Sequence, residues 1–208
     1  MCQNKPLTIK TRKVGVSMRN VVVSMFITLD GFIAGPNGEF DAFDPSEEEL
    51  TVGNEFFRSV DGFLFGRVIY EGFVSYWDAL DLTDGSLSPA NREFAEIFSK
   101  KTRAVFSRTL VKVDDNALLI KDNIAAAVSK LKHQPGRDLA LVCGPDLFAT
   151  LVQLGLIDEY RLMVLPIALG RGKALFGGLQ EGLKLKLLAT RVFASGTILH
   201  HYRSADML

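Results

Sequence analysis

Short apolar runs alternate with amphipathic stretches along most of the chain. Runs rich in β-branched and aromatic residues predict strands buried on both faces. These strands are expected over residues 20–28, 62–65, 102–106, 138–143 and 159–165. Between them, apolar residues recur every three or four positions, which predicts helices. Helices are expected over residues 46–58, 92–99 and 123–132, from residue 67 onward, and around Leu147, Leu151 and Leu154.

The last part of the chain follows a different pattern. A glycine-rich loop leads into two strands, over residues 184–193 and 197–202, which a short turn joins. Strands that alternate with helices and are followed by such a hairpin predict an α/β fold, with a mostly parallel sheet and an antiparallel edge. No repeat or linker interrupts residues 18–208, so we expect a single domain. Residues 1–17 carry four basic residues and no acid, and we expect a flexible leader there.

Composition excludes several classes of protein. The 208 residues include 24 basic and 24 acidic side chains, so no net charge draws the chain to nucleic acid or to a membrane. No apolar stretch reaches the roughly 20 residues of a membrane span. The two cysteines suggest neither a disulfide framework nor a zinc site, and the three histidines do not form a metal pattern. We therefore expect a cytoplasmic protein without a bound metal.

Small or polar residues stand at three junctions between a strand and the next helix. These junctions are Gly66-Arg67, Ser107-Arg108-Thr109 and Gly144-Pro145. In open α/β sheets, ligands bind beyond the carboxyl ends of the strands, where helix N-termini offer N–H groups to phosphates. Glycine permits close approach of the backbone, and arginine pairs with phosphate oxygens. Together the junctions suggest a dinucleotide site, although each glycine alone is more often structural.

The usual nucleotide and hydrolase motifs are absent. The sequence contains no G-x-G-x-x-G after the first strand, no P-loop and no G-x-S-x-G. Asp30 is a candidate catalytic residue because it directly follows a buried strand and precedes Gly31. The structural alternative is a turn aspartate that binds its own backbone.

Several stretches together resemble a known family. They are SMFITLDGFIAGPNG, LFGRVIYEGF, SRTL, CGPDLFATLVQLGLIDEYRLMVLPIALGRGKALF and the closing FASG. In this order they resemble the dihydrofolate reductase-like superfamily, and most closely the reductase C-terminal domain of RibD, the bifunctional riboflavin-biosynthesis protein. The match runs from Met18 to about Arg203. It implies a dihydrofolate reductase-like three-layer fold and a homodimer.

The resemblance also implies an NADPH-dependent reductase. Hydride would pass to a C=N or C=O bond of a small substrate, such as a pyrimidine with a phosphoribosyl group. Residues expected to bind the cofactor are Thr28, Ala34, Gly66, Arg67, Ile69, Ser107, Arg108, Thr109, Gly144, Pro145, Asp146 and Leu147. Asp30 would orient the substrate or relay a proton. Phe40, Tyr70, Trp77 and Arg171 are the other expected substrate residues. Arg171 would meet a substrate phosphate or, alternatively, lie in a solvated turn, and the alternative for the aromatic residues is a place in the core.

Departures from the family pattern keep other functions open. Pro145 removes one N–H donor from the third junction, and Asp146 adds a negative charge there. A non-catalytic nucleotide-binding module is therefore the alternative. Dihydrofolate reduction is less favoured, because the helix over residues 46–58 lacks a clearly matched inward acid after its first turn.

Overall fold

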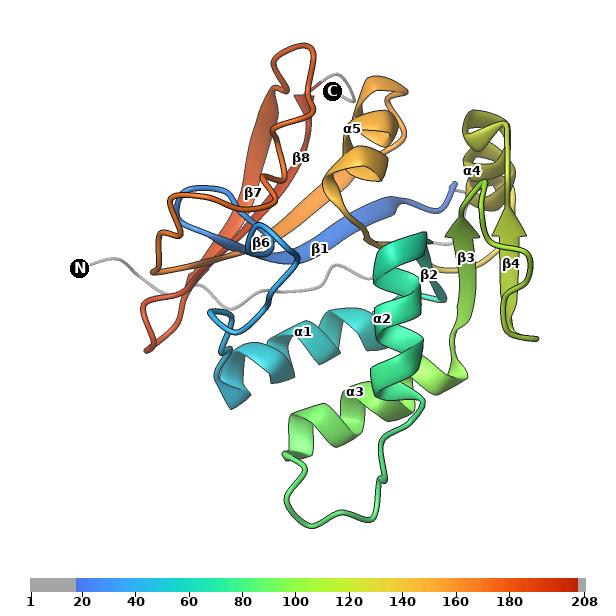
Figure 1. Cartoon of the computed structure of the whole chain (residues 1–208). Helices are drawn as coiled ribbons and strands as arrows, with labels where there is room; N and C mark the ends of the chain where they lie inside the picture. The colour runs from blue at the N-terminus through green and yellow to red at the C-terminus, as the bar shows by residue number, and fades with distance from the viewer. Residues whose placement is uncertain (1–17, 206–208) are drawn as a thin grey trace.

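The computed structural model describes residues 18–205, and the expected leader at residues 1–17 lies outside them. Thirteen helices and strands follow one another along the described chain (Figure 1). The strands are β1 (Val21–Thr28), β2 (Gly62–Gly66), β3 (Thr102–Phe106), β4 (Ala117–Ile120), β5 (Leu139–Val142), β6 (Glu159–Leu165), β7 (Leu185–Val192) and β8 (Ile198–Ser204). The helices are α1 (Glu47–Ser59), α2 (Arg67–Trp77), α3 (Pro89–Lys100), α4 (Ile124–His133) and α5 (Pro145–Gln153).

All eight strands form one sheet in the order β4-β3-β2-β5-β1-β6-β8-β7. The first six strands run parallel to their neighbours, whereas β8 pairs antiparallel with β6 and β7 antiparallel with β8. This arrangement confirms the expected fold class. It also places β5, late in the sequence, between β2 and β1.

Helices cover both faces of the sheet and create three layers. Leu64 of β2 belongs to the apolar core shared with α4 and α5, whereas its neighbours Phe63 and Phe65 face α1, α2 and α3. Successive strand residues point to opposite faces, so each central strand contributes to both cores. Phe94 and Phe98 of α3 pack against Phe63 in the second core. Figure 1 shows α1 and α3 side by side below the sheet, on the side opposite α5.

The helix starts follow from local chemistry. Ser46 and Glu49 form a capping box at the start of the helix expected over residues 46–58: Ser46 Oγ accepts from Glu49 N, and Glu49 Oε2 accepts from Ser46 N. Pro89 opens α3 behind Ser88, whose hydroxyl accepts from Asn91 N. In the described part of the chain, no helix is both long and apolar enough to span a membrane.

Candidate functional site

The expected junctions lie along one edge of the sheet. Because β3, β2, β5 and β1 are neighbours and parallel, their carboxyl ends lie at the same edge. The Ser107, Gly66, Gly144 and Asp30 junctions follow these ends. A Cβ atom placed on Gly66 would lie 3.5 Å from Leu147 Cδ2, so the starts of α2 and α5 are in contact range. The fold therefore brings together segments that are separated in sequence.

Two helices begin at this edge without a side-chain cap. Gly66 precedes α2 and Gly144 precedes α5, and neither has a side chain to bind the free N–H groups of the first turn. By contrast, Ser46, Ser88 and Asn123 cap α1, α3 and α4. Uncapped N–H groups and the positive end of the helix dipole favour an anion. The cap pattern thus marks α2 and α5 as the helices with unused donors.

The glycines at these two starts are not required by the backbone. Gly66 has φ −82° and Gly144 has φ −76°, values open to any residue. A Cβ on Gly144 would meet nothing within 4 Å, and one on Gly66 would make ordinary van der Waals contact with Leu147. Glycine therefore leaves open space in front of Gly144 and keeps a methyl group away from Leu147 at Gly66, so that a ligand could approach the backbone closely at both positions.

The side chains around these starts differ in their partners. Arg67 is exposed and pairs with Glu71 of its own helix, with Nη1 2.9 Å from Oε2. The Ser107 hydroxyl accepts from Thr109 N and Leu110 N, which fixes the turn after β3. Arg108 is exposed, and its guanidinium has no hydrogen bond or ion pair with residues 18–205. The edge therefore offers a cation that is not already engaged.

The start of α5 includes both departures that the sequence predicted. Pro145 takes the first helical position, and Asp146 is exposed in the first turn. Cys143, directly before Gly144, is fully buried, and this burial raises the pKa of its thiol. The N–H groups of Asp146 and Leu147 remain as the donors of this first turn.

Asp30 connects the end of β1 to the loop after β6. Its Oδ1 accepts from Thr28 Oγ1 at 2.6 Å and from Leu169 N at 3.2 Å, and its Oδ2 accepts from Gly170 N at 2.7 Å. The hydrogen bond from Thr28 is the largest cause of a lowered pKa for Asp30, followed by that from Gly170. Asp30 therefore stays ionised at neutral pH and acts as an acceptor.

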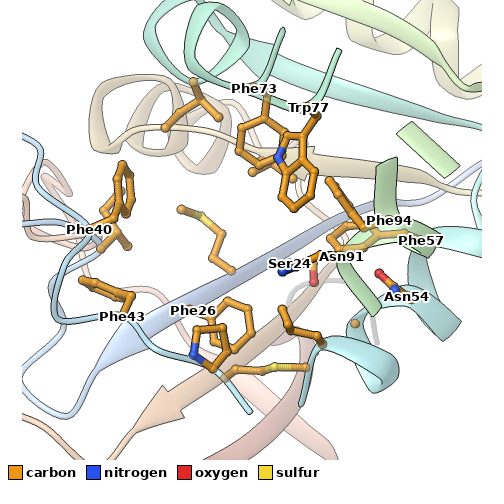
Figure 2. A pocket seen from close by; sticks show the side chains of 18 residues that line it. Ser24, Phe26, Phe40, Phe43, Asn54, Phe57, Phe73, Trp77, Asn91 and Phe94 are labelled. Atoms are coloured by element: carbon orange, nitrogen blue, oxygen red, sulfur yellow. The ribbon is translucent and has the colours of Figure 1, made fainter. Parts of the chain in front are cut away.

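A cavity of about 310 Å³ lies between the sheet and helices α1, α2 and α3, next to this edge (Figure 2). The residues that line it are almost all apolar, and none is charged. They are Ser24, Met25, Phe26, Ile33, Phe40, Phe43, Pro45, Leu50, Gly53, Asn54, Phe57, Ile69, Phe73, Trp77, Asn91, Phe94, Val142 and Met163. Ile69 of α2 and Val142 of β5 link the cavity to the two uncapped helix starts. A ligand along the edge could thus reach the cavity.

The expected substrate residues divide between the cavity and other places. Phe40, Trp77 and the expected cofactor residue Ile69 line the cavity, whereas Tyr70 does not. The Tyr70 hydroxyl donates to Asp114 Oδ2 at 2.6 Å and accepts from Asp114 N. Desolvation by burial, the largest cause, raises the pKa of Tyr70. Its ring points into the core beside Phe65.

Two further expected residues lie at the loops near the edge. Arg171 is exposed. The pKa of Glu39 is lowered mainly by the hydrogen bonds that its carboxylate receives from its own backbone N–H and from Asn37, and the charge of Arg171 lowers it further. Ala34 is buried, and its carbonyl accepts from Lys173 N.

Glu49 is the buried acid of α1. Its carboxylate accepts hydrogen bonds from Ser46 N and Ser195 Oγ, and Glu49 does not line the cavity.

Sequence reasoning missed most of the cavity. Phe26, Phe57, Phe73 and Phe94 read as core residues, and the cavity depends on where their elements meet. Asn54 offered a signal, because a polar residue between Gly53 and Phe57 interrupts the apolar face of α1. Residues 18–205 contain no cluster of histidine, cysteine or acidic side chains that could hold a metal ion.

Comparison with known proteins identifies the family. The model of the RibD C-terminal domain matches residues 19–199. The uncharacterized protein YyaP of Bacillus subtilis is 36% identical over 186 residues, covering 88% of this chain and 94% of that protein. RibD of Acinetobacter baumannii shares the fold, with a TM-score of 0.65 and 17% identity over 90% of this chain and 58% of that longer chain.

A dihydrofolate reductase from Enterococcus faecalis, solved with NADP(H) and RAB-propyl, also shares the fold. Its TM-score is 0.61 at 13% identity, and the match covers 91% of this chain and 99% of that one. The chain therefore belongs to the RibD C-terminal domain family, within the dihydrofolate reductase-like fold.

Proposed function

We propose that this protein is an NADPH-dependent reductase that transfers hydride to a C=N or C=O bond of a small substrate. One observation carries the proposal: two uncapped helix starts, each behind a glycine that the fold does not require, lie side by side next to an aromatic cavity. Family membership and the solved relative with NADP(H) support the choice of cofactor.

The residues at the edge fit a doubly phosphorylated cofactor. The first turns of α2 and α5 would donate N–H groups to the pyrophosphate. Arg108, which has no partner among the described residues, would pair with the 2′-phosphate and favour NADPH over NADH. When bound, NADPH supplies the hydride from its nicotinamide ring.

Asp30 is not among the residues that line the cavity, and we propose for it a narrower role beside the substrate. Its lowered pKa makes it a weak proton donor near neutral pH, so of the two proposed roles we favour orientation. Its two bonds to the loop after β6 would hold that loop against the end of β1. The proton that completes reduction would then come from water.

The test measures NADPH binding through Trp77, the sole tryptophan of the chain. Because Trp77 lines the cavity, NADPH bound nearby should quench its emission and accept its excitation energy. We expect Gly144→Ala and Gly66→Ala to weaken binding by roughly tenfold or more, because a methyl group would occupy the space in front of the backbone.

Gly72→Ala is the matched control, since Gly72 lies on α2 with nothing within 4 Å of a built Cβ, and it should bind NADPH like wild type. An absence of binding at millimolar NADPH would refute the reductase. Binding of NADPH without hydride transfer to any carbonyl or imine substrate would favour the non-catalytic nucleotide-binding module, for which Asp146 in the first turn of α5 is the structural argument.

A further inference from the structure

The cavity wall has one polar corner, made by three elements. Ser24 of β1, Asn54 of α1 and Asn91 of α3 are the polar residues among the 18 that line the cavity. Figure 2 shows them at one side, beside Phe57 and Phe94, with Phe40 and Phe43 on the opposite side. A few convergent polar groups in an otherwise apolar pocket are typical of sites that fix the orientation of a small ligand.

Asn54 determines what this corner can recognise. The residue is 2% exposed, and its Nδ2 donates to Ala90 O at 2.8 Å and to Glu93 Oε2 at 3.1 Å. Both neighbours are acceptors, so the amide orientation is fixed by its partners. Its Oδ1 accepts no hydrogen bond from residues 18–205. Asn54 therefore offers the cavity a neutral acceptor that needs a donor.

The other two corner residues complete a complementary set. The Ser24 hydroxyl and the Asn91 amide form no hydrogen bond with the described residues. Either can donate to a carbonyl oxygen. A ligand with an N–H or O–H group next to a carbonyl carries the groups that match these three side chains.

The remainder of the wall excludes charge. None of the lining residues is acidic or basic, and aromatic rings from α1, α2, α3 and the loop before α1 surround the space. A phosphate or carboxylate in this cavity would lose its hydration without gaining a counter-charge. A protonated ring would likewise meet the neutral Asn54 oxygen in place of a carboxylate.

We propose that the cavity binds an uncharged, flat ring system that donates an N–H or O–H group to Asn54 Oδ1 and carries no phosphate. That this ring system is the substrate rests on the proposed reductase function. The substrate class thus differs from a phosphoribosyl pyrimidine held by its phosphate.

The test uses three probes with the full-length protein and no cofactor. Quinolin-2(1H)-one is a neutral bicyclic ring with adjacent N–H and C=O groups, its N-methyl derivative lacks the donor, and uridine 5′-monophosphate carries a phosphate. Trp77 emission and calorimetry measure binding. We expect quinolin-2(1H)-one to bind about tenfold more tightly than its N-methyl derivative, the usual worth of one hydrogen bond. The nucleotide should bind more weakly than both.

Two variants assign the binding to this corner. Asn54→Leu should remove the preference for the N–H probe. Because that change also removes the bonds to Ala90 and Glu93, Gly53→Leu provides an independent variant: a Cβ at Gly53 meets only Phe57, at 3.9 Å, and a longer side chain would fill the cavity. It should abolish binding of both quinolinones while the protein stays folded.

Equal binding of the two quinolinones to wild type, or tighter binding of the nucleotide, would overturn the proposal. Unchanged binding by Gly53→Leu would also overturn it. The outcome is separable from that of the reductase, because the probes are tested without NADPH. Binding of quinolin-2(1H)-one together with failure of the NADPH titration would reject the reductase and retain the ligand class.

Discussion

Asp30 has a lowered pKa because its carboxylate accepts hydrogen bonds from Thr28, Gly170 and Leu169. A carboxylate with a lower pKa in the folded state than in the unfolded state stabilises the fold above its unfolded pKa. That contribution disappears as the pH falls from about 4 through the folded pKa. The bond network of Asp30 therefore makes a testable contribution to stability at neutral pH.

We expect Asp30→Asn to lower the urea midpoint of unfolding at pH 7, because an amide accepts these bonds less well than a carboxylate. The difference from wild type should shrink as the pH approaches 3. Urea unfolding at several pH values measures it. Asp41→Asn is the control, since Asp41 is exposed and has no hydrogen bond from residues 18–205. A difference that is constant with pH would contradict this account.

Gly72 lies within α2, where its φ is ordinary and a built Cβ has nothing within 4 Å. Alanine loses less backbone entropy on folding than glycine in a helix. Gly72→Ala should therefore raise the free energy of unfolding by roughly 0.5–1 kcal/mol. Chemical denaturation measures this gain, and a loss of stability would show that the helix needs the glycine.

Arg103 of β3 holds several elements in place. It is 3% exposed, and it binds both oxygens of Asp78, at the end of α2, at 3.0 and 3.1 Å. Its Nη1 lies 3.2 Å from Asp114 Oδ2, and its guanidinium stacks over the ring of Phe98 in α3. This ion-pair cluster of Arg103, Asp78 and Asp114 fixes the end of α2, which carries Trp77 into the cavity wall.

Removing the cation and removing the two carboxylates of this cluster should lower the free energy of unfolding by different amounts. Arg103→Met leaves two half-exposed carboxylates that water can solvate, so we expect a loss of about 1–3 kcal/mol. The double change of Asp78→Asn with Asp114→Asn leaves a buried cation without counter-charge and should cost about 3–5 kcal/mol. Urea unfolding compares the two, and a larger loss in Arg103→Met would contradict the argument.

Local chemistry allowed much of the element structure to be predicted from the sequence. The expected helix starts at Ser46 and Arg67 are confirmed, and a capping box at Ser46 explains the first of them. The sequence reading missed β4, a short edge strand whose Leu118 is exposed, because so few apolar residues give no clear period. It also placed the start of α3 at Arg92, although Ser88 and Pro89 carry a recognisable cap and first position.

In the candidate site, features set by a short stretch of sequence could likewise be predicted, whereas features set by packing between elements could not. The junctions at Gly66 and Gly144 could be predicted, because glycine at a strand-to-helix turn is visible in one short stretch. The cavity could not be predicted, because its wall depends on the packing of α1, α2 and α3 against the sheet. Tyr70 and Trp77 illustrate the difference: both lie on α2, yet one enters the core and the other the cavity.

At the scale of the whole molecule, the sheet edge formed by β7 indicates where a second copy of the chain would bind. β7 is the edge strand at the end of the sheet opposite β4, and its Leu187, Leu188 and Val192 are exposed. An unprotected apolar edge favours association with a second chain. The homodimer that the family resemblance implies would therefore use the β7–β8 hairpin, because β6 is enclosed between β1 and β8.

We predict that the protein is a homodimer and that Leu187→Glu combined with Val192→Glu yields a monomer. Sedimentation velocity measures the mass of both forms. Val111→Glu is the control, because Val111 is exposed far from β7, in the segment between β3 and β4, and should leave the dimer intact. A wild-type monomer, or a dimer that persists in the double variant, would contradict this interface.

The labelling rate of the Cys143 thiol reports how often the end of β5 opens. Its thiol is fully buried directly before Gly144, so a thiol reagent reacts there only when the end of β5 opens. In a Cys2→Ser background, the labelling rate of Cys143 therefore counts such openings. A ligand that binds the closed form at Gly144 should slow labelling in proportion to its occupancy, whether or not any reaction follows.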